Sequence, residues 1–558
     1  MSETWQLQEQ RARANIYALI IILAAFALLV YRLGETSLWA NEVRTAEWVE
    51  RLDQGGFEAL VDPSPGHPLS HPPLYFLSLW IWTSLTGDSE FSLRFPSVLF
   101  GTLAIAMVYP LAIRMVSRRV GLMTMGLMAI SPFLVMYSRI ARPYSTALFF
   151  ALISCWFFSQ LLVGPSTTRI WVWYIISSTA LMYTEYLVAF ALAAQTIVAL
   201  AGIRHNRRFV VQLLTAQLVV LLFFSPWIPF TIRLTGQVHS GSVALSGSDV
   251  MHWLLSVMHP FFAWIVGETI YPWNVAAIVG VILGLALAGR GLMSRPKIAG
   301  SEKMEAASED ASEPGVRGSP LGSEELPIGS SWGSLDLALP VFVLLPLSLT
   351  IVVNRYMLSE KTFMDVANKA IVCAPFLYLL LARGIWTIGG RGRRLLVVVV
   401  LGIVLGVSLT NYYLGHQLHN PNQGLPTRAM THEIVEQAEP DDMFVSDSTV
   451  GFDYYIFKED PEAVHFFAHF PHAAMGYVQE HQRPRVWLIL LCRAVETESL
   501  ATTELVPWLL NEGYALELSH WYAPLDGAYR NIQELILGKP ACEHKIIVQR
   551  YAPLKRES

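Results

Sequence analysis

Long apolar runs alternate with short polar loops from the N-terminus to about residue 412. A helix needs about 20 apolar residues to cross a bilayer, so runs near that length predict about eleven spans. The chain has 558 residues, of which 53% are hydrophobic and 15% charged, a composition typical of a polytopic membrane protein. The expected spans cover residues 15–33, 95–115, 120–138, 143–163, 170–185, 187–203, 209–228, 273–289, 336–353, 370–388 and 395–412.

The segment 73–86, PLYFLSLWIWTSLT, is apolar but short and rich in Trp and Tyr. It can either span or lie in the membrane interface. If it lies flat, the basic clusters all fall on one side, and an excess of Lys and Arg marks the cytoplasmic side. We therefore expect an interfacial helix, a cytoplasmic N-terminus and an outer loop at 34–94. The clusters are Arg11/Arg13, Arg114/Arg118/Arg119, Arg204/Arg207/Arg208, Arg290/Arg295/Lys297 and Arg391/Arg393/Arg394.

Two regions differ from the apolar bulk. Residues 296–334 are dense in Ser, Gly, Glu and Pro, which predicts a disordered cytoplasmic linker. Residues 413–558 alternate helix-like and strand-like runs, which predicts a small α/β domain with a mostly parallel sheet. The expected fold is thus an all-α polytopic membrane domain (1–412) followed by an extracytoplasmic α/β domain (413–558).

The net charge limits the possible partners, and the cysteine content limits the possible disulfide and metal sites. The net charge of −5 argues against nucleic acid as a partner. The four cysteines are too scattered for a disulfide framework or a zinc site. Cys155 and Cys373 fall in apolar spans and are expected to be packing residues. Cys492 and Cys542 lie in the tail, where one disulfide can form if the tail faces an oxidising space.

Polar residues gather in the loop between the first two apolar segments and in three further stretches expected on the same face. The loop contains Asn41, Glu42, Arg44, His67 and His71; the other stretches are SRIARPY (138–144), YTEY (183–186) and DVANKA (365–370). Polar groups near the apolar phase cost several kcal/mol unless they are paired or functional, so the four clusters predict a shared site. The alternative is that Glu42, Arg44, Arg142 and Glu185 form buried structural ion pairs, and that His67 is a solvated loop residue.

An ordered set of segments resembles a known family. It consists of SLWANEVRTAEW, HPPLYFLSLWIWTSLTGDSEFSLRFPSVLFGTLAIAMVY, SRRVGLMTMGLMAISPFLVMYSRIARPY and LMYTEY. Together they resemble the glycosyltransferase family 39-like membrane enzymes, relatives of the protein O-mannosyltransferases and of the lipid A aminoarabinose transferase, which have the GT-C fold. The resemblance is strong over residues 15–230 and weaker over the later spans, where CAPFLYLLLARGI is similar to a Pro-centred helix of the family.

The resemblance implies transfer of a sugar from a polyprenyl-phosphate-linked donor to a glycan, lipid or protein acceptor outside the cytoplasm, in an inner (plasma) membrane. The bilayer and the lipid-linked donor are the implied partners, and no cofactor or metal is required. In the family, an Asp-Glu pair in the first outer loop supplies the base, and basic residues contact the lipid phosphate. The corresponding residues here are Asn41, Glu42, Arg44 and His71. Further implied substrate contacts are Arg142, Tyr144, Tyr183 and Lys369.

The chain departs from the family at Asn41, because an amide replaces the carboxylate of the expected base. The later Gln-Glu-Ala-Arg-x-Tyr motif reads Arg139-Ile140-Ala141-Arg142-Pro143-Tyr144, which removes a second carboxylate. Where the family has Tyr-Thr-His-Tyr, this chain has Tyr183-Thr184-Glu185-Tyr186, so a carboxylate is added at Glu185. The usual Arg-Tyr of the late helix is replaced by Asn368-Lys369.

Two interpretations follow. Glu42 or Glu185 acts as the base of an active transferase, or the chain is an inactive subunit that binds a polyprenyl-phosphate carrier or assists a glycan-assembly partner. We favour the active enzyme, since a chain without a polar site would be expected to have replaced polar residues such as Glu42, Arg44, His71 and Arg142. A transporter is disfavoured because the charged residues cluster at one surface and no inverted repeat is visible.

Overall fold

The computed structural model describes residues 3–558 with several gaps. The gaps are residues 61–70, 165, 205, 231–247, 295–331, 357–364, 416–425, 447–450, 469, 482–483, 492–499, 523–545 and 555–558. His67, Cys492, Cys542 and nearly all of the expected linker 296–334 therefore lie outside the described residues.

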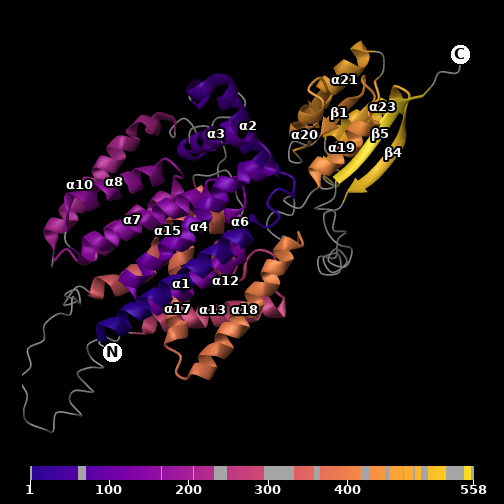
Figure 1. Ribbon diagram of the computed structural model, residues 1–558. Helices are drawn as coiled ribbons and strands as arrows, with labels where there is room; N and C mark the ends of the chain where they lie inside the picture. Colours follow the sequence, from indigo (N-terminus) through magenta and orange to yellow (C-terminus); the bar gives the residue numbers. More distant parts are fainter. Residues whose placement is uncertain are drawn as a thin grey trace, which may run out of the picture.

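The described residues as far as residue 413 form helices joined by turns (Figure 1). In order they are α1 (Glu3–Val30), α2 (Ala40–Gly55), η1 (Gly56–Leu60), α3 (Leu74–Thr86), α4 (Glu90–Met115), α5 (Arg118–Ile130), α6 (Pro132–Ser138), α7 (Tyr144–Val163), α8 (Thr168–Met182), η2 (Leu187–Ala189), α9 (Phe190–Ala201), α10 (Arg207–Phe224), η3 (Ser225–Trp227), α12 (Ser248–Val266), α13 (Val275–Met293), α15 (Trp332–Tyr356), α16 (Asp365–Lys369), α17 (Cys373–Trp386) and α18 (Arg391–Tyr413).

The helical bundle is that of a multi-pass membrane protein. Within the described part of the chain, seven helices are long and apolar enough to cross a membrane, or eight if the bent pair α5–α6 counts as one span. The expected spans 170–185, 187–203 and 370–388 appear as shorter helices of 15, 12 and 14 residues. Full-length spans are thus fewer than the sequence pattern suggested, because turns interrupt three apolar runs.

The bend between α5 and α6 positions the loop 139–143. Helices α5 and α6 meet at 64° across Ser131 and Pro132. Proline cannot donate the hydrogen bond that would continue α5, whereas it suits the first turn of a new helix. The Ser131 hydroxyl caps that turn by accepting from the Leu134 amide, and it also lies 2.6 Å from the Tyr378 hydroxyl. The short helix α6 therefore delivers Arg139 and Arg142 to a fixed place.

Among the described glycines, the two with the least space for a side chain lie where α13 contacts α17. A Cβ atom added at Gly384 would lie 2.0 Å from the carbonyl oxygen of Leu287, and one at Gly291 would lie 2.2 Å from that of Leu380. No side chain fits at such distances. Small residues permit tight helix contacts of this kind in membranes.

The first loop forms two helices outside the long spans. The 13-residue helix α3 is about 20 Å long, which is less than the hydrocarbon core of a bilayer. It packs against α2 through a cluster that includes Trp48, Leu52, Phe76 and Leu79. The segment 73–86 thus has the short helix expected of it.

In its described residues, the C-terminal domain has a five-stranded mixed sheet with helices. Its elements are α19 (Thr427–Gln437), β1 (Met443–Ser446), α20 (Phe452–Glu459), β2 (Val464–Phe467), α21 (Pro471–Glu480), β3 (Val486–Leu491), the π-helical turn η5 (Ala501–Leu505), α23 (Val506–Asn511), β4 (Tyr514–Tyr522) and β5 (Ile546–Pro553). The strand order is β2-β1-β3-β5-β4. Pairings β1–β2 and β1–β3 are parallel, whereas β3–β5 and β4–β5 are antiparallel. The expected mostly parallel sheet is therefore only half parallel.

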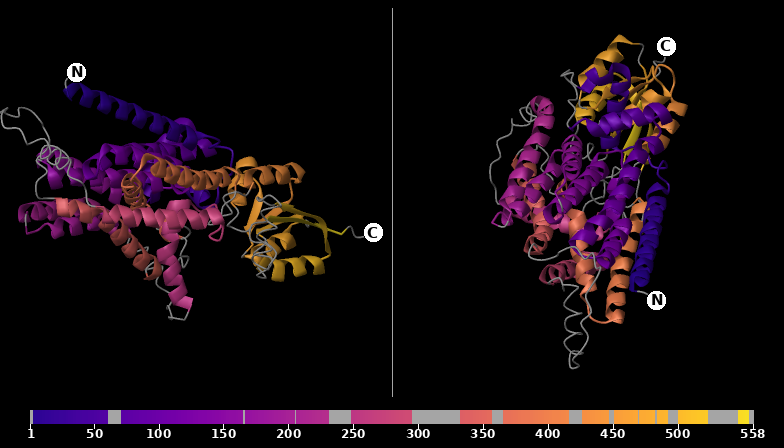
Figure 2. Two further views of the ribbon diagram at one scale, coloured as in Figure 1. Left: turned by 90° about the horizontal axis from the view of Figure 1, so that it is seen from below. Right: turned by 60° about the vertical axis from the view of Figure 1, so that its left-hand side comes forward.

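This domain contacts the first loop of the bundle. The Tyr455 hydroxyl accepts from the Leu38 amide at 2.7 Å and donates to Glu90. Ion pairs Arg428–Glu90 (2.8 Å) and Lys458–Asp88 (2.6 Å) flank that contact. Figure 2 shows the domain extending from the end of the bundle opposite the N-terminus.

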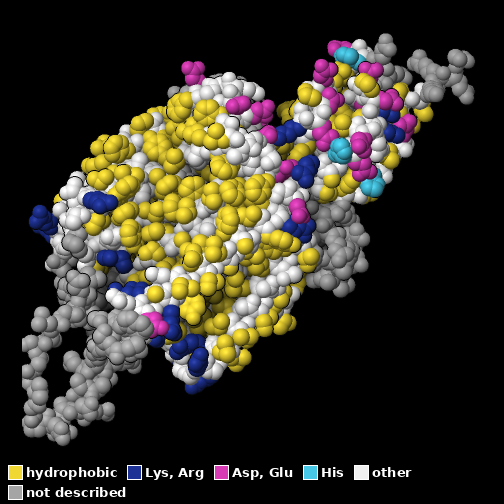
Figure 3. All heavy atoms as spheres, in the orientation of Figure 1, with side chains coloured by type: hydrophobic (Ala, Val, Ile, Leu, Met, Phe, Trp, Pro, Cys, Tyr) yellow, Lys and Arg dark blue, Asp and Glu magenta, His cyan; other side chains and the backbone are white. Residues whose placement is uncertain are grey.

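Charge is distributed unevenly along the molecule. Lys and Arg gather mostly at the end of the bundle away from the C-terminal domain, whereas Asp, Glu and His are concentrated on that domain and on the first loop (Figure 3). Arg119 and Arg394, far apart in sequence, both lie over the Trp386 ring, at 5.3 and 4.1 Å. Between the two ends the flank is covered with apolar side chains.

Candidate functional site

His71 joins three of the expected polar stretches. Its Nδ1 lies 3.1 Å from Glu185 Oε2, and its Nε2 lies 2.7 Å from Arg142 Nη2. The Leu74 amide donates to the carbonyl of Tyr183, which holds the start of α3 against the 183–186 turn. The first loop, the α6–α7 connection and the α8–η2 turn thus meet at one imidazole.

The partners of His71 determine its tautomer. A guanidinium can only donate, so Nε2 of His71 must accept from Arg142. The remaining proton is then on Nδ1 and is donated to the Glu185 carboxylate. Burial would raise the pKa of Glu185, but His71, Arg142 and Lys369 together outweigh burial and hold that pKa below its ordinary value. Glu185 is therefore ionised at neutral pH.

The cationic side chains near His71 are those of Arg142 and of Lys369 on α16. Arg142 is 9% exposed, and its Nε has no hydrogen-bond partner among the described residues. Lys369, at the end of α16, donates to Asn354 Oδ1 at 2.9 Å. The Tyr144 ring stands edge-on to Tyr137, with their centroids 5.1 Å apart. A buried donor with a free hydrogen is the feature expected of a site that receives an anion.

An apolar groove of about 660 Å³ begins beside this cluster. Pro73, two residues after His71, and Tyr183, two residues before Glu185, both line it. The Tyr183 hydroxyl donates to the Phe223 carbonyl and so turns away from the polar cluster. The other lining residues are Phe57, Leu74, Leu77, Ile175, Ile176, Thr179, Ala180, Phe223, Pro226, Trp227 and Phe230.

Glu42 has a different environment from Glu185. It is fully buried and forms a two-pronged ion pair with Arg94, at 2.8 and 2.7 Å. Its Oε1 also accepts from the Ala141 amide at 2.8 Å. Both carboxylate oxygens are therefore occupied, which is the arrangement of a structural ion pair.

Arg44 and Asn41 are not drawn into the His71 cluster. Arg44 is exposed on α2 and makes no hydrogen bond or ion pair with the residues that the structure describes. Asn41 is half-buried one residue before Glu42, and its carbonyl accepts from Thr45. Of the expected site residues, the structure thus brings together His71, Glu185 and Arg142, with Lys369 close enough to act on Glu185.

Sequence reasoning missed Arg94 and Glu268. Arg94 is a single charge in the apolar run FSLRFPSVLF, which is a signal for a buried partner. Glu268 is 2% exposed, accepts from the Tyr137 hydroxyl at 3.1 Å and lies 3.9 Å from His259. It follows the apolar helix α12 (Ser248–Val266). In the described chain, no group of three or more His, Cys, Asp or Glu side chains is arranged to hold a metal ion.

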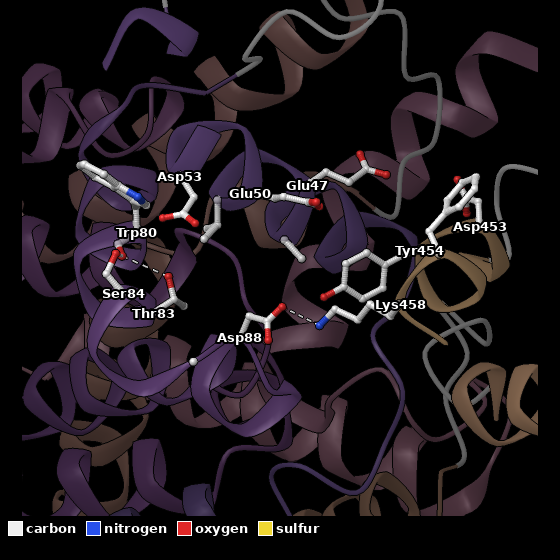
Figure 4. A pocket seen from close by; sticks show the side chains of 14 residues that line it. Glu47, Glu50, Asp53, Trp80, Thr83, Ser84, Asp88, Asp453, Tyr454 and Lys458 are labelled. Atoms are coloured by element: carbon white, nitrogen blue, oxygen red, sulfur yellow. Dashed lines mark hydrogen bonds and ion pairs between the residues drawn. The ribbon is translucent and has the colours of Figure 1, made fainter. Parts of the chain in front are cut away.

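A second cavity, of about 730 Å³, lies where the first loop meets the C-terminal domain (Figure 4). Acidic side chains from α2 and from α20 face it, with Trp80 and Tyr454 as aromatic walls. Burial raises the pKa of Glu47, and nearby Asp453 raises it further. Burial also raises the pKa of Asp453. The other acidic residues that line the cavity are Glu50, Asp53 and Asp88.

This cavity predicts that docking of the C-terminal domain depends on pH. A carboxyl whose pKa is raised on docking binds its proton more tightly in the docked state, so docking weakens as pH rises from about 4 toward neutrality. Hydrogen exchange of α20 amides is expected to be slower at pH 5 than at pH 7.5. The double variant Glu47→Gln/Asp453→Asn should remove most of that difference, whereas Glu436→Gln, an exposed change on α19, should not. A pH-independent wild type would contradict the assignment.

Comparison with known proteins follows this geometry. Residues 70–230 match the family model for dolichyl-phosphate-mannose-protein mannosyltransferase. No curated protein matches the chain. Among solved structures, the chain is similar to ArnT from Cupriavidus metallidurans bound to undecaprenyl phosphate, with 13% identity and a TM-score of 0.49 over 95% of this chain and 97% of that chain.

A second similar structure is the archaeal oligosaccharyltransferase AglB from Archaeoglobus fulgidus in complex with an inhibitory peptide and a dolichol-phosphate. Its identity is 12% and its TM-score 0.46, over 92% of this chain and 74% of that chain. The family match covers the loop from His71 onward, α4 to α10 and the YTEY turn. Over residues 70–230 it confirms that this chain resembles the glycosyltransferases related to the protein O-mannosyltransferases.

Proposed function

We propose that this protein is a membrane glycosyltransferase that uses a polyprenyl-phosphate-linked sugar as donor. One observation carries the proposal: the His71 cluster contains a buried Arg142 donor without a partner among the described residues, and Pro73 and Tyr183, close to that cluster in the chain, line an apolar groove. An isoprenoid chain suits the groove because apolar burial alone drives its binding. The phosphate at the head of such a lipid suits Arg142, because its buried Nε has no hydrogen-bond partner among the described residues.

The leaving group determines what these cations do. When the bond between the sugar and the phosphate breaks, negative charge grows on the phosphate oxygens. Arg142 and Lys369 are placed to stabilise that charge, and both also keep Glu185 ionised. Tyr144, at the start of α7, is the proposed wall for the sugar. Arg44 is exposed, so we propose that it only attracts the anionic donor and does not contact it during the reaction.

Glu185 and His71 together supply the base in this proposal. The acceptor hydroxyl must lose a proton as its oxygen attacks the anomeric carbon. When Arg142 turns to the phosphate, His71 Nε2 is freed to take that proton, and Glu185 stabilises the resulting imidazolium through Nδ1. Glu42 is committed to Arg94, so it is the weaker candidate of the two expected carboxylates.

The acceptor is proposed to approach from the face that bears the C-terminal domain. The acidic and aromatic cavity of Figure 4 lies on that face, and aromatic rings with hydroxyl-binding carboxylates suit a sugar or a glycan. The basic end of the bundle would be cytoplasmic, since Lys and Arg are enriched in cytoplasmic loops. The catalytic cluster would then be extracytoplasmic, in an inner (plasma) membrane.

A transfer assay tests the proposal. Purified protein in lipid vesicles is given a panel of polyprenyl-phosphate-linked sugars, and loss of sugar from the lipid is measured with membrane-extract acceptors. Arg142→Met is expected to reduce turnover by about a hundredfold, because a charge-assisted contact to the leaving group is lost. Arg44→Met, which removes an exposed cation, should change it little. Equal turnover in wild type and Arg142→Met would overturn the donor site.

The second candidate function is a non-catalytic subunit that binds the lipid carrier, and Asn41 is the observation that favours it. The same assay separates the two. An inactive wild type that gains turnover on Asn41→Asp supports the binding subunit. A wild type that turns over donor supports the enzyme.

A further inference from the structure

We propose that Arg139 forms a second oxyanion site, separate from the His71 cluster, where the last span ends. The site is a cavity of about 90 Å³ between the end of α1, the α6–α7 connection and the end of α18. Its ligand is a compact phosphate group, borne either by an anionic membrane lipid or by free phosphate.

Arg139 is the residue that carries this inference. It is 7% exposed, and neither its Nε nor its Nη1 has a hydrogen-bond partner among the described residues. Its guanidinium lies over the rings of Tyr413 and Tyr412, at 4.6 and 5.3 Å from their centroids. The rings hold the flat group in place and leave its N–H edge available, which is the presentation that a phosphate requires.

Among the described residues that line the cavity, no acid pairs with Arg139. Arg94 is paired with Glu42, and Arg32 is paired with Glu35. Those two acids and three guanidinium groups account for the charged residues that line the cavity. An uncompensated buried cation costs several kcal/mol, partly offset here by the tyrosine rings. An anion would remove that cost.

The cavity has the size and position for such a ligand. Its volume has room for a few water molecules or one compact oxyanion. Arg32 and Glu35, which are 48% and 55% exposed, form its rim. The ring of Tyr31, just before that rim, stands edge-on to Tyr413, and Tyr31 is 57% exposed at the end of the apolar α1. A lipid headgroup can therefore reach the cavity from the side.

The site is distinct from the proposed donor site. Arg139 and Arg142 flank one tight turn, but Arg142 faces His71 whereas Arg139 faces α18. Neither His71, Glu185 nor Arg142 lines the cavity of Arg139. An anion here would connect the first and last spans beside the start of the C-terminal domain, and so would steady that junction.

The test is thermal unfolding of the whole protein in nanodiscs. One arm adds inorganic phosphate to neutral phosphatidylcholine discs, with chloride at equal ionic strength as reference. The other replaces part of the lipid with phosphatidylglycerol and adds no phosphate. At least one arm is expected to raise the Tm of wild type by about 2 °C or more, and the arm that does so identifies the source.

Arg139→Met should abolish that rise. Without added anion this variant should melt at or above wild type, since it loses an uncompensated charge. Arg142→Met, which changes only the donor site, should keep the Arg139-dependent rise. No rise in wild type in either arm overturns the proposal, as does an equal rise in Arg139→Met. Because the readout is stability, its failure is distinguishable from failure of the transfer assay.

Discussion

Glu185→Gln is expected to reduce sugar transfer by about a hundredfold or more, which is the usual contribution of a positioned base. The amide keeps the shape of the side chain but cannot stabilise a positive imidazolium, so His71 can no longer take the proton of the acceptor. The loss should appear in kcat, since the donor contacts at Arg142 and Lys369 remain. Turnover of a polyprenyl-phosphate sugar in vesicles measures it.

Glu480→Gln is the matched control, because Glu480 is an exposed acid on α21 and lines none of the cavities described above. It should leave kcat unchanged. Thermal unfolding of both variants is measured alongside, and Glu185→Gln should melt close to wild type. If Glu185→Gln turns over normally, the base assignment is wrong.

Arg94→Met is expected to destabilise the protein by about 3–5 kcal/mol, which is the cost of breaking a buried ion pair from one side. Arg94 donates to both oxygens of Glu42. It also donates to the carbonyls of Leu33, Thr36 and Ser37, which fixes the connection between α1 and α2 on α4. The variant leaves the Glu42 carboxylate buried without its cation. Unfolding in detergent, followed by tryptophan fluorescence, measures the change.

Arg32→Gln provides the comparison, since Arg32 and Glu35 form an exposed ion pair on the same connection. Exposed pairs contribute little, so its unfolding should match wild type. Like Arg94→Met, Glu42→Gln should lose both stability and activity. Glu185→Gln should lose activity alone. A stable, inactive Glu42→Gln would instead make Glu42 the base.

The meeting of His71, Glu185 and Arg142 was predictable because three apolar runs end at these residues on one expected face. The identity of the partners was not. His71 and Glu185 are 114 residues apart, and nothing in local periodicity states which acid a histidine will contact. The family resemblance supplied the candidate positions, and the backbone hydrogen bond between Leu74 and Tyr183 supplies the register that joins them.

Glu42 illustrates the opposite case. Its position after Asn41 suggested chemistry, but its partner lies 52 residues later inside a helix that reads as a plain membrane span. Tertiary pairing decided its role. In the tail, the predicted alternation of helix and strand is seen in the described elements, among them β1, β3 and β5. Strand direction was misjudged because β5 returns to pair antiparallel with β3, which the order of runs does not reveal.

The glycine contact between α13 and α17 restricts where this molecule can move. Two backbones already in contact at Gly384 and Gly291 can neither slide nor tilt inward without collision. If the proposed donor lipid enters the bundle from the side, the opening would therefore lie elsewhere. In Figure 1, α8 and α10, which border the apolar groove, lie on the other side of the bundle from this contact. In that case the contact at the two glycines would stay fixed while α8 and α10 move apart to admit the lipid.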